Sequence, residues 1–321
     1  MALVEIFSRV HKVIHKAMQI LKKLAEGLLF PEGPVAMQDG SVIFVEMRAG
    51  LIRRVSANGE LSIVADCGGG PNGAAIGPGG ALYVCNNGGN NYAQGHFTSS
   101  GPALNYEGGS IQKVNWHTGV TETLYDSCQG HRLSAPNDLV FDKNGGFYFT
   151  DFGKKRARSR DHGGLYYALA DGSFISELVY PIQAPNGVGL SPDGLILYVA
   201  ETETSRLWAF DVIAPGKIKK LDFPSQNGGR LVCGLPGFQR FDSLALDESG
   251  NICVATLMTG HISVISPAGD LLRQVKFPDS YVTNICFGGD GLKTAYITLS
   301  ETGQLVSMPW PEAGLKLNFN A

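Results

Sequence analysis

Six segments of the sequence begin with a polar residue whose side chain carries an oxygen atom. These residues, the anchors, are Glu32, Asn72, Asn137, Asn186, Asp242 and Asn284. Because no anchor is a histidine or a cysteine, the set offers two carboxylates and four amide carbonyls. Oxygen donors suit a hard cation, and an irregular set favours calcium over magnesium, which requires a nearly ideal octahedron. We therefore predict one divalent cation, Ca²⁺ by preference, with Mn²⁺, Mg²⁺ or Zn²⁺ as alternatives.

A simpler explanation of the anchors is that they belong to turns. Asn-Gly and Asn-Asp pairs are common turn signals, because asparagine tolerates a left-handed backbone and hydrogen-bonds within its own turn. For Asn72-Gly73 alone this explanation would suffice. Glu32 and Asp242 occupy equivalent positions in other copies, however, and turn chemistry does not require a carboxylate there. The two carboxylates favour the metal-site interpretation.

The segments that follow the anchors repeat one pattern and predict the fold. Each has a short apolar run, a glycine-containing turn, and a second run rich in β-branched and aromatic residues, as in a β-hairpin. In the third copy, Pro136-Asn137-Asp138 leads through a turn at 142–146 to Phe147-Tyr148-Phe149. Six copies predict an all-β, six-bladed β-propeller of four-stranded antiparallel blades over residues 25–321. Since the innermost strand of each blade lines the central channel, the anchors should converge at one mouth.

Two long loops each follow the second strand of a copy, so we expect them on the same face as the anchors. The first, residues 86–109, carries Tyr92, His96, Phe97 and Tyr106, and the second, residues 152–163, carries Lys154, Lys155, Arg156, Arg158, Arg160 and His162. Long loops on a rigid scaffold often bind ligands, so both are expected to roof the channel. The alternative for the second loop is a solvated basic segment whose arginines pair with carboxylates.

Residues 1–24 differ in pattern and predict one N-terminal amphipathic helix. Apolar residues recur at helical spacing from Val4 to Leu24, and lysines fall between them. We expect this helix to pack on the propeller or on a second subunit, which would make the protein a homo-oligomer. Attachment to a membrane surface through the basic face is the less favoured alternative.

The composition excludes several classes of function. A net charge of -3 without a basic stripe gives no electrostatic basis for binding nucleic acid. No apolar run is long enough to cross a membrane and no signal-peptide pattern is found, so the expected location is cytoplasmic. The six cysteines form no CxxC pair, and most are expected to be buried thiols. A serine esterase is disfavoured because no G-x-S-x-G sequence is present.

The six anchor-containing segments, taken together, resemble those of the senescence-marker-protein / gluconolactonase / luciferin-regenerating-enzyme family. The resemblance runs from about Leu24 to the last copy, and its most specific passages are Phe30-Pro31-Glu32-Gly33-Pro34, Arg132-Leu133-Ser134-Ala135-Pro136-Asn137-Asp138, Ala184-Pro185-Asn186-Gly187 and Phe241-Asp242-Ser243. It implies a metal held by Glu32, Asn186 and Asp242, with Asn137 as a fourth ligand or a substrate contact. It also implies that Asp242 is the general base and that Arg132 lies beside the substrate.

These expectations define a hydrolase that opens small lactone or ester rings by attack of water, with Asp242 and Asn137 as catalytic residues. Further expected substrate contacts are Asn72, Tyr92, His96 and His162. One alternative is a phosphotriesterase-like hydrolase in which Asp242 attacks phosphorus directly. The other is a non-catalytic propeller that binds a protein partner and holds calcium for structural reasons.

Overall fold

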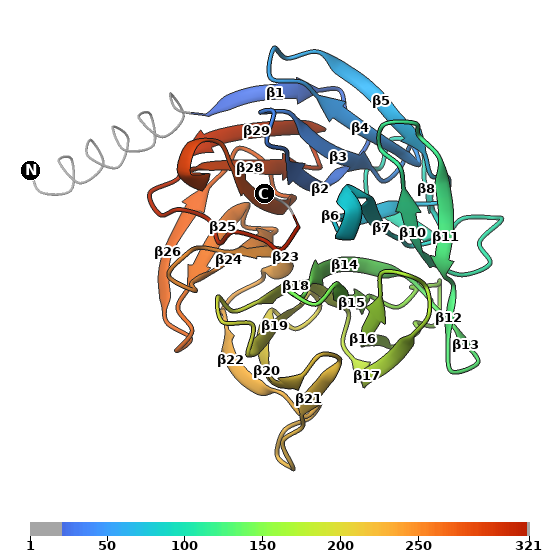
Figure 1. The fold of residues 1–321 in the computed structure, drawn as a ribbon, viewed down its shortest axis with the longest axis vertical. Helices are drawn as coiled ribbons and strands as arrows, with labels where there is room; N and C mark the ends of the chain where they lie inside the picture. Colours follow the sequence, from blue (N-terminus) through green and yellow to red (C-terminus); the bar gives the residue numbers. More distant parts are fainter. Residues whose placement is uncertain (1–20, 320–321) are drawn as a thin grey trace, which may run out of the picture.

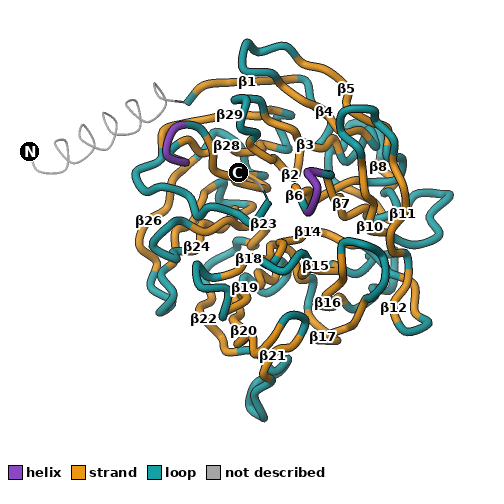
Figure 2. Tube along the Cα trace, viewed as in Figure 1, coloured by secondary structure: helices purple, strands orange, loops and turns teal. Residues whose placement is uncertain are grey.

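The computed structural model describes residues 21–319, which form a ring of six β-sheets around a central channel (Figure 1). The ribbon path is almost entirely strand and loop (Figure 2), and the helical pieces of the described chain are the 3₁₀ turns η1 (Pro78–Gly80) and η2 (Asp290–Leu292). The innermost strands β2, β6, β14, β18, β23 and β27 each contact the next, and β27 returns to β2. The predicted six-bladed propeller is confirmed.

The first three blades follow the chain from the channel outwards. Blade 1 contains β2 (Pro31–Ala36), β3 (Val42–Glu46), β4 (Leu51–Val55) and β5 (Leu61–Asp66). Blade 2 contains β6 (Pro71–Ile76), β7 (Leu82–Asn86), β10 (Ser110–Val114) and β11 (Thr121–Tyr125). Blade 3 contains β14 (Pro136–Phe141), β15 (Gly146–Asp151), β16 (Gly163–Leu169) and β17 (Ile175–Ile182).

The remaining blades show two variations. Blade 4 has five strands, because both β21 (Lys217–Lys219) and β22 (Arg230–Gly234) pair with β20 (Arg206–Ala214), outside β18 (Pro185–Leu190) and β19 (Ile196–Glu201). Blade 5 is regular, with β23 (Arg240–Leu246), β24 (Ile252–Leu257), β25 (His261–Ile265) and β26 (Leu271–Lys276). Blade 6 joins β27 (Val282–Gly288), β28 (Thr294–Leu299) and β29 (Gln304–Pro309) to β1 (Lys22–Glu26). One small hairpin, β8 (Asn90–Tyr92) with β9 (Ser99–Pro102), lies within blade 2 between β7 and β10 in sequence, and another, β12 (Ser127–Cys128) with β13 (His131–Arg132), lies between blades 2 and 3.

The expected N-terminal helix needs a correction at its end. Lys22 to Leu24 belong to strand β1, which pairs antiparallel with β29. Without β1, β29 would be an unpaired edge of blade 6, and pairing of this edge outweighs the helical spacing of the sequence. Residues 1–20 of the expected helix lie outside the described residues, so the subunit contact built on it stays a prediction. Within residues 21–319, no helix is long and apolar enough to cross a membrane.

The hydrophobic core consists of six separate layers, each between two neighbouring blades. Between blades 2 and 3, for example, Tyr83 packs edge-on against Phe141 with ring centroids 5.0 Å apart. Every blade contributes one face to each of two layers, which explains why apolar residues fill the central strands on both faces. All six cysteines are unpaired; Cys85, Cys128 and Cys253 are buried, and the other three are partly buried.

The anchors lie within the inner strands, not in turns, so the turn explanation is wrong. Each inner strand has an irregularity in its pairing with the second strand at or beside the anchor, for example between Glu32 and Val35. Such bulges bend a strand and re-aim a side chain, and they are common beside active sites. Four of the inner strands begin with the proline that precedes the anchor, where a missing N–H is tolerated.

The glycine after an anchor is required by the narrowness of the ring. A Cβ atom at Gly73 would lie 2.6 Å from the backbone oxygen of Asn137, and one at Gly187 would lie 2.6 Å from the backbone nitrogen of Leu244. These contacts are with the backbone of the next inner strand, which cannot rotate away. The Asn-Gly pairs therefore reflect close approach of neighbouring blades.

We expect Gly73→Ala to destabilise the fold by about 1–3 kcal/mol, because the added methyl group overpacks the contact between blades 2 and 3. Thermal unfolding of the variant checks this. Gly234→Ala is the matched control, since its Cβ would find the nearest atom at 3.6 Å. Equal melting temperatures for the two variants would contradict the proposed steric role.

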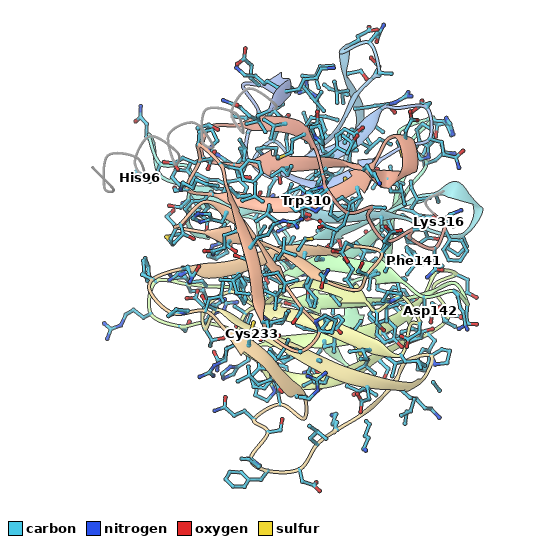
Figure 3. The ribbon with its side chains drawn as sticks, turned by 90° about the vertical axis from the view of Figure 1, so that its left-hand side faces the viewer. His96, Phe141, Asp142, Cys233, Trp310 and Lys316 are labelled. Carbon is cyan, nitrogen blue, oxygen red and sulfur yellow. The ribbon has the colours of Figure 1, made fainter. Side chains whose placement is uncertain are left out.

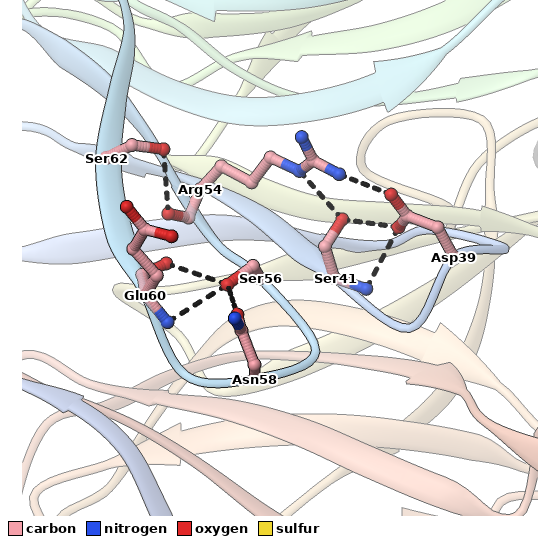
Figure 4. Close-up of polar contacts among 7 residues, drawn as sticks. All are labelled: Asp39, Ser41, Arg54, Ser56, Asn58, Glu60 and Ser62. Carbon is pink, nitrogen blue, oxygen red and sulfur yellow. Dashed lines mark hydrogen bonds and ion pairs between the residues drawn. The ribbon is translucent and has the colours of Figure 1, made fainter.

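The turns on the face opposite the anchors use the chemistry that the sequence predicts. In the Asp39-Gly40 turn, Asp39 Oδ1 accepts hydrogen bonds from the backbone nitrogen of Ser41 (3.0 Å) and from its hydroxyl (2.6 Å) (Figure 4). Arg54 donates from Nε to Ser41 Oγ at 2.9 Å and pairs with Asp39. This network joins the turn between β2 and β3 to strand β4 of the same blade.

The chain after blade 6 crosses the channel mouth opposite the anchors. Leu315 donates from its backbone nitrogen to the oxygen of Leu246 (2.8 Å), and Asn318 Nδ2 donates to the oxygen of Phe141 (3.0 Å). The edge-on view places Phe141, Asp142 and Lys316 towards this face and His96 at the opposite one (Figure 3). This covering segment, together with the inner strands, encloses an apolar cavity of about 100 Å³. The sequence did not predict it.

Candidate functional site

Five anchors line one cavity of about 350 Å³ at the mouth roofed by the long loops. They are Glu32, Asn72, Asn137, Asn186 and Asp242, and all are buried. The sixth anchor, Asn284, stands behind them and donates from Nδ2 to Glu32 Oε2 at 3.0 Å. The ring geometry thus brings together residues that are far apart in sequence.

Neighbouring blades hold the two carboxylates in place. Glu32 Oε2 also accepts a hydrogen bond from the backbone nitrogen of Gly33 at 3.0 Å. Asp242 Oδ1 accepts a hydrogen bond from Asn186 Nδ2, which donates to Thr202 Oγ1 at 3.1 Å as well. Each carboxylate is therefore positioned by an anchor of the preceding blade.

Three carboxylates, Glu32, Asp138 and Asp242, are buried in the channel, and burial is the main reason that the pKa of each is raised. Burial is the main reason that the pKa of Glu32 rises to about 7, although hydrogen bonds from Asn284 and Gly33 oppose the rise. Burial and then the negative charge of Glu32 raise the pKa of Asp242 well above its usual range. The pKa of Asp138 is also raised to about 7, mainly by burial. A positive charge nearby would favour the ionised form of these carboxylates and lower their pKa values.

The cavity residues fit a hard cation. The side-chain oxygens of Asn72 and Asn137 are buried without a hydrogen-bond partner, an arrangement that costs free energy unless another ligand satisfies them. No cluster of three or more His, Cys, Asp or Glu side chains with metal-binding geometry occurs in residues 21–319. The candidate donor set instead mixes two carboxylates with neutral amide oxygens, which is a composition found in calcium sites.

The first long loop reaches across the mouth. Tyr92 lines the cavity, and its hydroxyl is buried without a partner. Phe97 packs edge-on against Tyr281, which precedes blade 6, with ring centroids 4.7 Å apart. The expected roof over the anchors is therefore present on this side.

The second long loop both lines the cavity and forms ion pairs at the surface, which are the two roles predicted for it as alternatives. Lys154 is buried at the cavity and donates from Nζ to the backbone oxygens of Asn87 (2.8 Å) and Gly89 (2.7 Å), which joins the two loops. Burial lowers the pKa of Lys154 to about 8. Arg156 pairs with Asp161, and Arg160 pairs with Glu203, as expected for a solvated basic segment.

Three predicted substrate contacts lie elsewhere. Arg132 is exposed on the β12–β13 hairpin, and His96 is exposed at the outer part of the first loop. His162 is exposed at the end of the second loop. Its ring is perpendicular to that of Tyr180, and the two ring centroids are 6.2 Å apart. None of the three lines the cavity. Nearness in sequence to an anchor or a roofing loop does not determine which way such a side chain points.

Several cavity residues were missed by the sequence analysis. Besides the anchors, Thr202, Glu203, Arg240 and Tyr281 line the cavity, and Asp138 lies buried below it. A usable signal was the position two residues before an anchor, where Phe30, Ala135 and Arg240 all face the cavity. For Asp138 the signal was the carboxylate that replaces glycine after the third anchor.

A six-bladed propeller with an oxygen-rich cavity at one channel mouth defines a scaffold that can hold a cation and a small ligand together. Residues 30–301 match the family described as SMP-30/Gluconolactonase/LRE-like region, and the chain belongs to this family. The resemblance inferred from the motifs is thereby confirmed.

Individual relatives agree with this assignment. A gluconolactonase of Zymomonas mobilis is 24% identical over 308 residues, which cover 87% of this chain and 79% of that enzyme. Lactonase drp35 of Staphylococcus haemolyticus is 33% identical over 142 residues, covering 44% of this chain but only 42% of that enzyme. Two solved structures share the fold. A gluconolactonase from Xanthomonas campestris has a TM-score of 0.72 at 22% identity (91% and 89% coverage), and the calcium-binding protein regucalcin from Agrobacterium tumefaciens has 0.73 at 16% (94% and 97%).

Proposed function

We propose that this protein is a divalent-metal-dependent lactonase that opens small lactone or ester rings in the anchor cavity. The observation that carries the proposal is the convergence of Glu32 and Asp242 with the unpartnered amide oxygens of Asn72 and Asn137. The names of the relatives, gluconolactonase and lactonase, support the same reaction class.

Glu32, Asn137, Asn186 and Asp242 are the residues that would hold the ion, with calcium as the preferred metal. The name of the calcium-binding structural neighbour supports this choice. When bound, a divalent ion supplies Lewis acidity that polarises a carbonyl oxygen and a positive charge that favours the ionised carboxylates.

Asp242 is the proposed general base. Its carboxylate would take a proton from a water molecule as the water oxygen bonds to the lactone carbonyl carbon. The bond from this carbon to the ring oxygen then breaks, and the ring oxygen receives a proton. Asn137, whose side-chain oxygen has no partner in the cavity, is proposed to contact the substrate or the ion. The partner is a small molecule, and the cytoplasm is the proposed place of action, on the evidence of the sequence alone.

The activity is tested by following the acid that ring opening releases, with a pH indicator, over a panel of lactones with and without a chelator. Metal analysis of the same preparation should find about one divalent ion per chain. Turnover that survives complete removal of divalent ions would contradict the metal-dependent mechanism. Absence of turnover on every lactone by the loaded protein would favour the binding-scaffold alternative.

Divalent ions should stabilise the fold more at neutral than at acidic pH. Because the pKa of Glu32 is higher in the folded protein, about 7, than its ordinary 4.5, the folded state binds more protons between these values. The metal-free protein is therefore expected to lose stability as the pH rises from about 4.5 towards 7. Melting temperatures with calcium and with chelator, measured at pH 5 and pH 7.5, check this. An equal calcium-induced shift at both pH values would contradict the expectation.

A further inference from the structure

A group of charged side chains stands at the rim of the cavity, on loops of blades 3 and 4 and at the first residue of β23 in blade 5. Glu203 binds two arginines at once: its Oε1 lies 2.7 Å from Arg160 Nη1, and its Oε2 lies 3.2 Å from Arg240 Nη2. Between 24% and 34% of each of these side chains is exposed, so the group is open to the solvent of the cavity. Both oxygens of the one carboxylate are therefore already engaged.

Lys155 adds a third positive charge to this rim cluster, which we define as Lys155, Arg160, Glu203 and Arg240. An antiparallel bridge pairs Lys155 with Arg160, and directly paired residues have neighbouring side chains. Lys155 lines the cavity and is exposed. Within residues 21–319 it forms no ion pair. Arg160 and Arg240 thus share one carboxylate and Lys155 has none, which leaves a surplus of positive charge at the rim.

The cavity offers this surplus no other internal partner. Its lining contains two further carboxylates, Glu32 and Asp242, but these are buried anchors held by Asn284 and Asn186. Lys154, also in the lining, adds positive charge and makes its hydrogen bonds to backbone oxygens. With a neutral sugar ring in the cavity, Lys155 would remain without an ionic partner and the two arginines would share only Glu203, whereas an anion would pair with them.

We infer that the substrate carries an anionic group, a carboxylate or a phosphate, on a substituent away from the ring carbonyl, and that Lys155 and Arg240 bind this group. The inference rests on the proposed function, because it names the class of lactone that the same cavity accepts. Arg240 supplies a planar donor that suits either anion, and Lys155 supplies a flexible point charge. Both are specificity-determining residues.

Matched lactones test the inference. The series has one ring and one stereochemistry and carries at the same carbon a hydroxymethyl, a carboxylate or a phosphomethyl group. We expect KM to be about tenfold lower for the charged lactones at low salt, with kcat changed much less, and the difference to shrink at high salt. Comparison of KM for the carboxylate-bearing and the phosphate-bearing lactone shows which of the two anions the rim prefers.

Variants connect the preference to the rim. Lys155→Gln should lower the kcat/KM ratio of charged to neutral lactone by about three- to tenfold, and Arg240→Gln should also lower it. Lys155→Arg should retain the preference. Lys143→Gln, an equal loss of charge on the opposite face, is the matched control. Equal KM values for neutral and charged lactones, or a preference that both rim variants leave intact, would overturn the inference.

Binding measured without turnover separates this inference from the proposed function. Calorimetry compares the ring-opened acid that carries one negative charge with the corresponding acid that carries two. If no lactone is hydrolysed but the dianion binds more tightly through Lys155, the proposed function fails and the rim assignment stands. If neutral lactones are hydrolysed and the charge makes no difference to KM or binding, the rim assignment fails alone.

Discussion

Replacing Asp242 by asparagine is expected to lower lactone turnover by about a hundred- to ten-thousand-fold, the usual contribution of a general base. The substitution retains a side-chain oxygen for a metal ion but removes the proton acceptor. Turnover must be measured at saturating calcium or manganese, and metal occupancy must be determined in the same sample. Under these conditions reduced metal affinity cannot account for a loss of rate.

Asp138→Asn is the matched control for this experiment. Asp138 is another buried channel carboxylate that does not line the cavity and affects Asp242 only through a minor contribution of its charge, so its variant should retain turnover within a few fold. If the Asp242→Asn protein, with its metal site fully occupied, hydrolyses lactone nearly as fast as the parent, Asp242 is only a metal ligand. Transfer of ¹⁸O from labelled water to Asp242 in a single turnover would instead indicate direct attack by its carboxylate.

Glu32→Gln is expected to weaken divalent-ion binding by about a hundredfold or more. Loss of a residue that only orients a metal ligand typically costs ten- to a hundredfold, and Glu32 would be one of only two anionic ligands. Competition with a calcium-chelating dye measures the affinity of parent and variant directly. The result does not depend on catalysis.

Glu203→Gln controls for the loss of one negative charge in the same cavity. Its carboxylate already binds Arg160 and Arg240, so its removal should change metal affinity much less than Glu32→Gln does. Unchanged affinity in Glu32→Gln would show that Glu32 is not a ligand. Equal losses of metal affinity in the two variants would mean that the effect comes from the total negative charge of the cavity and not from a bond between Glu32 and the ion.

The repeating features of the fold could be predicted from the sequence, because each sequence copy corresponds to one blade of the ring. The anchor positions, the two first strands of each blade and the roofing loops all follow from the pattern, and five anchors line the predicted mouth. The prediction also contained the reason for convergence, since inner strands of a propeller share one channel.

Features that depend on one particular contact were not predictable in this way. Lys22 and Lys23 continue a helical pattern, but the open edge of β29 recruits them into a strand. Arg132 precedes Asn137 by only a few residues, yet the β12–β13 hairpin carries it to the surface. Glu203, on a loop of blade 4, and Arg240, at the start of β23 in blade 5, form an ion pair at the cavity rim, and no local pattern encodes such a pair.

The pairing of β1 with β29 also determines when the site can form during protein synthesis. Glu26 pairs with Gln304, which is synthesised much later, and the hydroxyl of Ser300 donates a hydrogen bond to the backbone oxygen of Pro31 at 2.6 Å. Glu32 itself depends on Asn284 of the last blade for its hydrogen bond. Contacts between such distant segments form late, because the intervening chain must first be available and ordered. The complete carboxylate site can therefore form only after Asn284 and the strands of blade 6 have been synthesised, and we expect binding competence to arise only at that stage of translation.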